Sequence, residues 1–418
     1  MRKIFKRVYI SCPSLIKILL TLLYDLYGDV YCKFKKTPNI KRSNGIENIK
    51  KKILFYHISG LSFGGTEKFL QIIAKYLDKN KYEVFFMYSS KNRKDFSKRT
   101  DGRASYLQNA EVHFLPFDYE LFEEKYPYYI KGMRPHILNT INEKGIDLVI
   151  TATDGHTEYP INLIKNIPII LINIFGAPTL QRNITKNICI SNEVANKIRG
   201  IVSKEKIEVI YIPSEKPSEN SVNKGLEIRK RLGINDSDIV FGRIGRADDS
   251  IFDQIGIEAF KKLVSKYSNA HYIIMSPPPV LINIVSEEKI PNVHFLPPSS
   301  NEEDIWAFHN SIDVLAHFRK DGESCGLNIA ESMLCSKPII SHKSTIWNAH
   351  LEYLDFSFSR VAEINNVTQY ASYMEEMLKF KKSDQLRQMG QMAKEKAENL
   401  FLIDNTIIKF DSLLKNLP

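Results

Sequence analysis

The sequence predicts an α/β protein with two doubly wound domains behind a basic, amphipathic extension. The chain has 418 residues, which is too long for one compact core. Short apolar runs alternate with helical patterns along most of it, as expected for parallel sheets covered on both faces. A polar stretch from Pro213 to Lys224 interrupts this alternation, which then restarts.

Residues 1–50 form the predicted extension and linker. Much of the net charge of +10 lies there, on two basic clusters that flank an apolar run from Ser14 to Gly28. This run is shorter than the about 20 apolar residues of a membrane span, and no secretory cleavage site follows it. We therefore expect residues 1–36 to bind anionic lipid headgroups as an in-plane helix, rather than a nucleic acid. A helix packed on the protein's own core is the alternative.

The first domain is predicted over residues 51–222. Ile53 to Ile58 indicate a strand, and Glu67 to Leu77 have the apolar spacing of a helix. Between them lies a turn that contains Gly64 and Gly65. Further strands are predicted at YEVFFMYSS, EVHFLPF, IDLVITA, IPIILINI, NICIS and IEVIYIP.

The second domain is predicted over residues 223–395, with strands at DIVFGRIG, HYIIMS, NVHFLP, IDVLAHF and KPIIS. Helices are predicted at FDQIGIEAFKKLVSKY, EEDIWAFHNS and LNIAESML. Two helices should cover Ser383 to Leu417, and we expect the segment 396–418 to pack back on the first domain. Ligands of such sheets bind beyond the carboxyl ends of the strands, so the expected site is a cleft that the two domains face.

The stretch GESCGLNIAES allows two interpretations. Gly322, Ser324 and Gly326 match G-x-S-x-G, the turn that presents a serine nucleophile, and His342 or His350 could complete a triad. That turn requires the strand to run directly into the first glycine, whereas RKD separates the strand IDVLAHF from it. We therefore do not favour a serine hydrolase.

The two glutamates of this stretch, Glu323 and Glu331, fit a different chemistry. Gly326, Leu327 and Asn328 open a helix, whose free backbone N–H groups and dipole suit a diphosphate. Carboxylates accept hydrogen bonds from sugar hydroxyls, so that one glutamate could bind a hexose and the other a ribose.

These residues resemble the E-x7-E region of retaining glycosyltransferases of the large family four. The run GESCGLNIAESMLCSKPII carries that resemblance, and GLSFGGTEKFLQIIAKYL is similar to the family's glycine loop and first helix. CISNEVANKI, IRKRLGI and GRIGRADDSIFDQIGIEAFKKL follow in the family's order. The resemblance runs from about residue 52 to the end of the chain. It implies the GT-B fold of two Rossmann-like domains facing a cleft, with a nucleotide diphosphate sugar as donor.

The resemblance implies a role for each of five residues. Glu331 would hold the ribose, and Glu323 would contact hydroxyls of the transferred sugar. Arg246 would stabilise the charge of the leaving diphosphate. Gly64 and Gly65 would let their loop approach the donor phosphates or the acceptor.

The sequence departs from the family's pattern at three positions. Ile251 stands where the family usually has a lysine a few residues after the arginine. Half of the usual basic pair is therefore missing, unless Arg243 or a lysine elsewhere replaces it. Phe175 stands where an active-site histidine is common, and His156 is the nearby candidate for a catalytic role. Ser336 replaces the glycine that ends the helix.

No cofactor and no metal are expected. The D-x-D pattern of Asp236 and Asp238 could bind a metal in another glycosyltransferase fold, but here it lies at a predicted turn. The five cysteines show no paired spacing, which is typical of reduced thiols in a cytoplasmic protein.

We therefore expect a metal-independent, retaining hexosyltransferase, peripheral on the inner face of the cell membrane. Its acceptor would be a saccharide or lipid-linked saccharide in surface polysaccharide biosynthesis. A non-catalytic subunit that binds a nucleotide sugar or saccharide is the main alternative, because a lysine and a histidine are missing. An epimerase or phosphorylase on the same fold is a third possibility.

Overall fold

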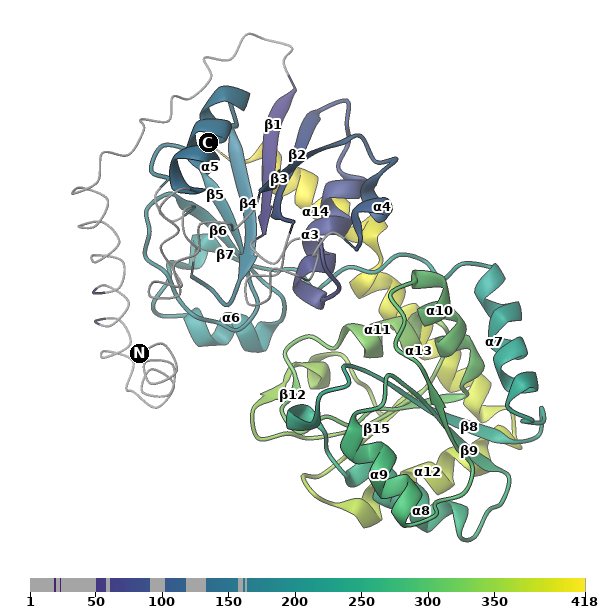
Figure 1. Cartoon of the computed structure of the whole chain (residues 1–418). Coiled ribbons are helices and arrows are strands. Elements are labelled where there is room, and N and C mark those ends of the chain that lie inside the picture. The colour runs from purple at the N-terminus through teal and green to yellow at the C-terminus, as the bar shows by residue number, and fades with distance from the viewer. Residues whose placement is uncertain are drawn as a thin grey trace. The chain divides into compact units, whose positions relative to one another are not determined.

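The computed structural model describes residues 19, 23, 50–57, 61–90, 102–117, 133–156, 161 and 164–417. They divide into two compact units (Figure 1). The first comprises the described residues up to Tyr211 and those from Ile407 onward, and the second comprises Ile212–Thr406. The interfacial helix predicted for residues 1–36 lies outside the described residues, apart from Leu19 and Leu23. Within the described ranges, no helix has both the length and the apolar character needed to cross a membrane.

The first unit is built around a seven-stranded parallel sheet with the order β3-β2-β1-β4-β5-β6-β7. Its strands are β1 (Lys51–His57), β2 (Tyr82–Ser89), β3 (Val112–Phe117), β4 (Leu148–Thr153), β5 (Ile169–Asn173), β6 (Ile184–Cys189) and β7 (Ile207–Val209). Its helices are α3 (Gly65–Tyr76), α4 (Ala104–Leu107), α5 (Met133–Lys144) and α6 (Asn192–Ile198).

The central strands of this sheet are mostly apolar because both of their faces are covered. Every residue of β4 and β5 is buried. The largely apolar runs IDLVITA and IPIILINI, which lack a regular polar alternation, are typical of such strands. Alternate residues of β1, β4 and β5, among them Leu54, Val149 and Leu171, join one apolar core cluster.

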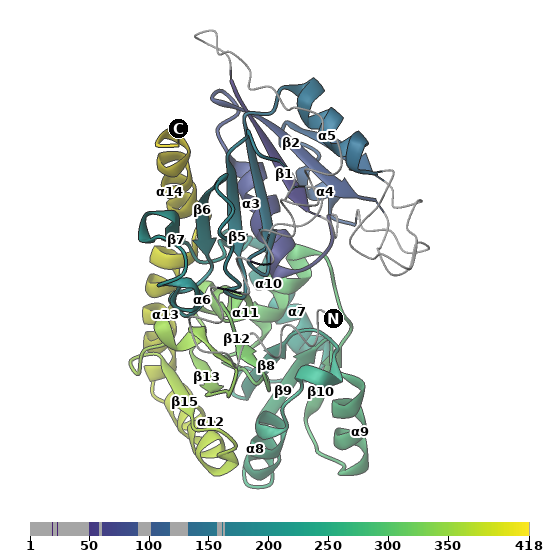
Figure 2. The same cartoon turned by 90° about the vertical axis from the view of Figure 1, so that its left-hand side faces the viewer.

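The second unit contains a six-stranded parallel sheet with the order β10-β9-β8-β11-β13-β15, and a two-stranded sheet of β12 and β14. Helices flank the larger sheet (Figure 2). Its strands are β8 (Ile239–Ile244), β9 (Ala270–Met275), β10 (Val293–Leu296), β11 (Val314–Ala316), β12 (Gly322–Glu323), β13 (Ile339–His342), β14 (Trp347–Asn348) and β15 (Ser359–Ala362). The helices that lie in or begin in this unit are α7 (Asn220–Arg231), α8 (Ile255–Val264), α9 (Pro279–Glu287), α10 (Glu302–Ser311), α11 (Leu327–Leu334), α12 (Val367–Lys381), α13 (Gln385–Phe401) and α14 (Ile403–Lys415).

Local hydrogen bonds fix where several helices begin. The side chain of Ser191 accepts the N–H of Val194 at the start of α6. Asn301 and Asn366 cap α10 and α12 in the same way, as expected for residues with short polar side chains. At the other end of α11, Ser336 has a φ of 58°, a left-handed conformation that glycine adopts more readily.

The structure differs from the sequence prediction at the domain boundary. The chain divides between Tyr211 and Ile212, before the polar stretch, whereas the prediction placed the boundary after residue 222. The polar residues from Asn220 to Lys224 are not a linker but the first turns of α7. Their side chains suit a helix face that points to solvent, which explains why composition alone suggested a loop.

The C-terminal segment forms two helices, α13 and α14, as the sequence predicted. The chain returns to the first unit within α14. There the ring of Phe410 packs edge-on against that of Phe69, with 6.2 Å between the ring centres. The hydroxyl of Tyr82 donates a 2.8 Å hydrogen bond to Asp411.

Each of the two large sheets has one point where the strand order reverses. In the first sheet β1 lies between β2 and β4, and in the second sheet β8 lies between β9 and β11. Loops that leave the carboxyl ends of such strands diverge to opposite faces, so a ligand can enter between them. The two reversal points are therefore where functional side chains are expected in each unit.

Candidate functional site

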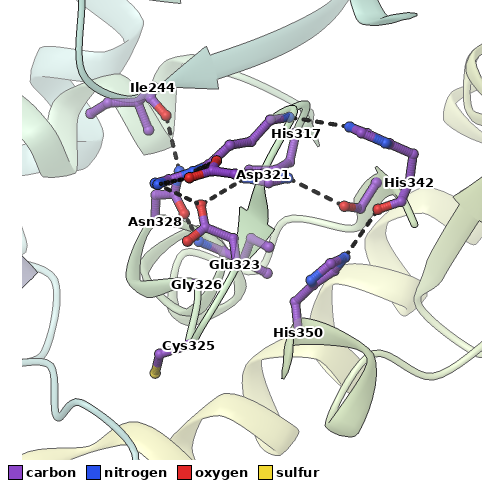
Figure 3. Close-up of polar contacts among 12 residues, drawn as sticks. Ile244, His317, Asp321, Glu323, Cys325, Gly326, Asn328, His342 and His350 are labelled. Carbon is purple, nitrogen blue, oxygen red and sulfur yellow. Dashed lines mark hydrogen bonds and ion pairs between the residues drawn. The ribbon is translucent and has the colours of Figure 1, made fainter. Parts of the chain in front are cut away.

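The candidate site of the second unit lies at the carboxyl ends of β8 and β11. Arg243 is the penultimate residue of β8, and His317 directly follows β11. The side-chain amide of Asn328 donates a 2.9 Å hydrogen bond to the carbonyl of Ile244, which ties the start of α11 to the end of β8 (Figure 3). Strand order therefore brings together residues that the sequence separates widely.

Glu323 lies at the centre of a cluster of polar contacts (Figure 3). Nε2 of His317 is 3.0 Å from Oε1 of Glu323, and a guanidinium nitrogen of Arg319 is 3.7 Å from the same oxygen. Burial alone would raise the pKa of Glu323. The hydrogen bond from His317 and the charge of Arg319 outweigh burial, so the pKa lies below its usual value. Glu323 is therefore ionised at neutral pH.

The N-terminus of α11 is held next to this carboxylate. Gly326 precedes the helix with a φ of 86°, in the left-handed region. The hydroxyl of Tyr353 donates a 2.7 Å hydrogen bond to the carbonyl of Cys325, which fixes the loop. The first N–H groups of a helix have no carbonyl partner within it and carry the positive end of its dipole. This terminus can therefore bind an anionic group.

Replacing Gly326 with alanine should destabilise the protein by about 2 kcal/mol or more. Left-handed backbone costs an L-residue about 1–2 kcal/mol, and the added Cβ would lie 2.6 Å from the Tyr353 hydroxyl. Gly233→Ala is the matched control, since Gly233 has a φ of 70° but no atom near the position of a Cβ. Urea denaturation of both variants separates the two costs; equal losses would show that the contact with Tyr353 is unimportant.

Glu331 lies inside α11 and is buried, with 5% of its surface exposed. Its Oε2 is 3.6 Å from Nε2 of the buried His309, whose Nδ1 is 2.7 Å from the hydroxyl of Ser332. A glutamate that merely faced solvent would need no such partner. Burying a carboxylate is costly unless it is paired, so the burial of Glu331 indicates a specific role.

Arg243, rather than Arg246, is the buried arginine at the end of β8, and its charge interacts with that of Glu323. Arg246 is exposed in the loop after β8, whereas Arg243 is 2% exposed and its guanidinium carbon lies 4.9 Å from the centre of the Phe318 ring. Burial lowers the pKa of Arg243 to about 10, so it stays charged at neutral pH. Within the described part of the chain, neither Nε nor Nη1 of Arg243 has a hydrogen-bond partner.

The position expected to hold a lysine, Ile251, is buried in a short turn after β8. Its side chain is uncharged, so it cannot supply the positive charge of a lysine. The second cation near Glu323 is instead Arg319, which follows β11. Its guanidinium is also paired with Asp321, through contacts of 2.5 and 3.0 Å.

The structure does not support a nucleophilic serine. Ser324 follows β12, which belongs to the two-stranded sheet and not to the main sheet. Nε2 of His342 accepts the backbone N–H of Arg319 at 3.1 Å, and Nε2 of His350 donates to the carbonyl of His342 at 3.2 Å. No hydrogen bond joins Ser324 to either histidine in the described residues, so the arrangement of a triad is absent there.

His350 should make the second unit sensitive to acid. It is fully buried, and burial lowers its pKa from 6.5 to about 4. Between pH 6.5 and about 4, this histidine is protonated in the unfolded chain but neutral in the folded chain. The stability that the folded protein has above pH 6.5 is therefore lost as the pH falls towards 4. Linkage gives a loss of about 2 kcal/mol at pH 5. His350→Gln should remove this part of the loss, measured by urea denaturation at pH 5 and 7.5; an unchanged pH dependence would contradict the assignment.

The candidates of the first unit lie at the reversal point of its own sheet. Gly64 and Gly65 follow β1, and His156 follows the neighbouring β4. Gly64 has a φ of −177°, an extended conformation open to any residue, and a Cβ there would lie 2.2 Å from the carboxylate of Glu67. Because that carboxylate ends a flexible side chain that can move away, neither backbone conformation nor space requires a glycine at position 64. Phe175, at the position of the usual histidine, is partly exposed after β5.

Within the described residues, no group of three or more potential ligands is arranged to hold a metal. The D-x-D pattern forms a turn in which the carboxylate of Asp238 accepts the N–H of Asn235 at 2.8 Å. Asp238 also lies 3.6 Å from Nε2 of His271. These contacts give Asp238 a local structural role.

Sequence reasoning missed three side chains of this site: His317, Arg319 and His309. The signal for His317 and Arg319 was present, because both sit just before Glu323 at the carboxyl end of a buried strand. His309 carried no such signal. It lies on α10, and only the packing of α10 beside α11 brings it to Glu331.

The second unit matches a known protein family. Residues 226–396 match the model described as glycosyl transferases group 1. No curated protein is significantly similar to the chain.

Several solved structures share the fold. HepE from Anabaena, crystallised in complex with UDP-glucose, has 16% sequence identity and a TM-score of 0.66, covering 88% of this chain and 100% of its own. A glycosyltransferase from Rickettsia africae has 15% identity and a TM-score of 0.70 over the same shares. Sucrose-phosphate synthase from Thermosynechococcus elongatus has 13% identity and a TM-score of 0.65, covering 88% of this chain and 98% of its own. The chain therefore has the GT-B fold of two Rossmann-like domains.

Proposed function

We propose that the protein is a retaining, metal-independent hexosyltransferase that uses a nucleotide diphosphate sugar. It transfers the hexose to a saccharide or lipid-linked saccharide in surface polysaccharide biosynthesis. The observation that carries the proposal is the buried cation Arg243 at the reversal point of the sheet, whose charge interacts with that of the ionised Glu323. Among the described residues, two of its nitrogens have no hydrogen-bond partner. A buried charge without hydrogen bonds is costly. An anionic ligand such as a diphosphate would satisfy it.

Each group of the site has a part in this reaction. The N–H groups of Leu327 and Asn328 at the start of α11 bind the diphosphate, together with Arg243. As the bond to the sugar breaks, negative charge grows on the diphosphate, and a fixed cation stabilises it. Glu323 accepts hydroxyls of the hexose and Glu331 those of the ribose. The first unit, with Gly64, Gly65 and His156 at its reversal point, holds the acceptor.

Two further lines support a nucleotide sugar as donor. The matched family consists of glycosyl transferases, and HepE, which shares the fold, was crystallised with UDP-glucose. Arg319 provides a second positive charge near Glu323, so the absence of a lysine at position 251 does not leave the site with a single cation. This favours a catalyst over a subunit that only binds sugars.

The test is release of the nucleoside diphosphate by the full-length protein. UDP-glucose, GDP-glucose and ADP-glucose are each incubated with and without a membrane lipid extract as the source of acceptor. We expect one donor to release its nucleoside diphosphate only when acceptor is present, and NMR should show the anomeric configuration of the donor in the product. Binding without release would establish the binding subunit, and release without acceptor or inverted product would contradict the proposal.

Residues 1–36 are proposed to hold the enzyme on the inner face of the membrane. The basis is their sequence alone, an apolar run between basic clusters. The full chain should float with vesicles that contain anionic lipid, whereas a variant without residues 1–50 should not. Equal flotation of the two would show that this segment is not the membrane anchor.

A further inference from the structure

The two oxygens of the Glu323 carboxylate have different surroundings. Oε1 is the atom that both His317 and Arg319 approach. Oε2 has no hydrogen-bond partner among the residues that the structure describes. One oxygen is thus held by the protein, and the other is left to accept a hydrogen bond from a ligand.

The proton arrangement on His317 follows from its neighbours. An ionised carboxylate can only accept hydrogen bonds, so Nε2 of His317 must carry the proton that points to Glu323. Nδ1 lies 3.2 Å from the hydroxyl of Ser341 on β13. In a neutral imidazole Nδ1 has no proton and accepts the hydroxyl of Ser341. Ser341 therefore supports the tautomer that donates to Glu323.

His317 is rigidly placed. Its side chain is buried, its N–H donates to the carbonyl of Ile340 at 2.8 Å, and its carbonyl accepts the hydroxyl of Tyr370 at 2.9 Å. Both backbone groups are therefore anchored to neighbouring elements. An imidazole whose backbone is anchored at both its N–H and its carbonyl can fix the orientation of a carboxylate that lies on a loop.

We infer that His317 is the positioning residue of Glu323: it holds Oε1, with Ser341 behind it, so that Oε2 faces the hydroxyls of the transferred sugar. The role of Oε2 rests on the proposed function, whereas the hydrogen bond and the tautomer do not. The charged and titratable groups around the pair are Arg319 on the same loop, Arg243 at the end of β8, and His342 and His350. Burial keeps the pKa of His350 and of His342 low, so both are neutral near pH 7.

The first arm of the test needs no ligand. The full-length protein is labelled with ¹⁵N at histidine, and the signal of His317 is identified by its loss in His317→Gln. We expect a protonated Nε2 at neutral pH, and a shift of this signal in Glu323→Gln. An unprotonated Nε2, or no response to Glu323→Gln, would overturn the inference whatever the protein's activity is.

The second arm uses the donor that gives turnover, or UDP-glucose in the first instance. His317→Leu should lower kcat about 10- to 100-fold, since misplacing a contact group by about 1 Å costs on that order. The affinity for the nucleoside diphosphate, which lacks the hexose, should stay unchanged. His317→Gln, which can still donate to Oε1, should recover most of the loss.

The pH profile separates positioning from a general loss of folding. Without the hydrogen bond from His317 the pKa of Glu323 rises, so the acidic limb of kcat/KM should move to higher pH in His317→Leu. His294→Leu is the matched control, because His294 is a partly buried histidine of the same unit that contacts His271, not Glu323. A parallel loss in both variants with no pH shift would overturn the positioning role. If the wild type gives no turnover, the proposed function fails. The NMR experiment still tests whether His317 donates its hydrogen bond to Glu323.

Discussion

Arg243→Met should abolish most turnover while making the free protein more stable. Removing one group that stabilises developing charge lowers turnover about 10²–10³-fold, which corresponds to about 2.7–4 kcal/mol. The free protein should gain about 1 kcal/mol or more, since a buried cation with two unpaired nitrogens is replaced by an apolar side chain of similar length. Turnover and urea denaturation without ligand measure the two effects. A substitution that lowers activity but raises stability is typical of a residue that is retained for function.

Arg246→Met is the matched control for this experiment. Arg246 lies three positions further along the chain, in the loop after β8, and is exposed, so its removal should change turnover and stability little. The resemblance to the family pointed to Arg246 through spacing alone. A larger loss of turnover in Arg246→Met than in Arg243→Met would reverse the assignment made from burial.

Glu323→Gln should lower turnover about 100-fold or more without unfolding the protein. Glutamine has nearly the same shape but no charge, so it loses the charge-assisted contacts with the sugar hydroxyls and with His317. Affinity for the nucleoside diphosphate should stay the same or rise, because a negative charge near the phosphates is removed. Steady-state kinetics and calorimetric titration with the nucleoside diphosphate measure these two quantities.

Glu227→Gln serves as the control for the loss of one carboxylate. Glu227 is exposed on α7 of the same unit. If Glu323→Gln kept the turnover of this control, the carboxylate at position 323 would have no part in the reaction.

The sequence predicted the architecture well because strand and helix patterns are local. The helices at EEDIWAFHNS and LNIAESML begin and end where the pattern places them. The prediction was wrong at the boundary near residue 222, where polar residues form the exposed face of α7. Composition does not distinguish a polar helix face from a polar loop, whereas in the structure Asn220–Arg231 is a helix that packs against α10.

Only the part of the candidate site that is formed by residues close together in the sequence could be predicted. Glu323, Gly326 and Asn328 follow one another closely along the chain. Arg243 and His309 join them through the order of the strands and the packing of helices, which no local pattern specifies. The choice between Arg243 and Arg246 likewise needed burial, because both fit the spacing within a few residues.

The most direct test of the central claim is thermal stabilisation of the full-length protein by nucleotides. UDP, GDP, ADP and their glucose derivatives are added to the wild type, to Glu331→Ala and to Glu227→Ala. A ligand at about 100 times its dissociation constant adds about 2.7 kcal/mol. We expect one nucleotide to stabilise the wild type and Glu227→Ala, and Glu331→Ala to lose this response. No stabilisation of the folded wild type by any nucleotide, or an undiminished response in Glu331→Ala, would contradict a donor site at the start of α11.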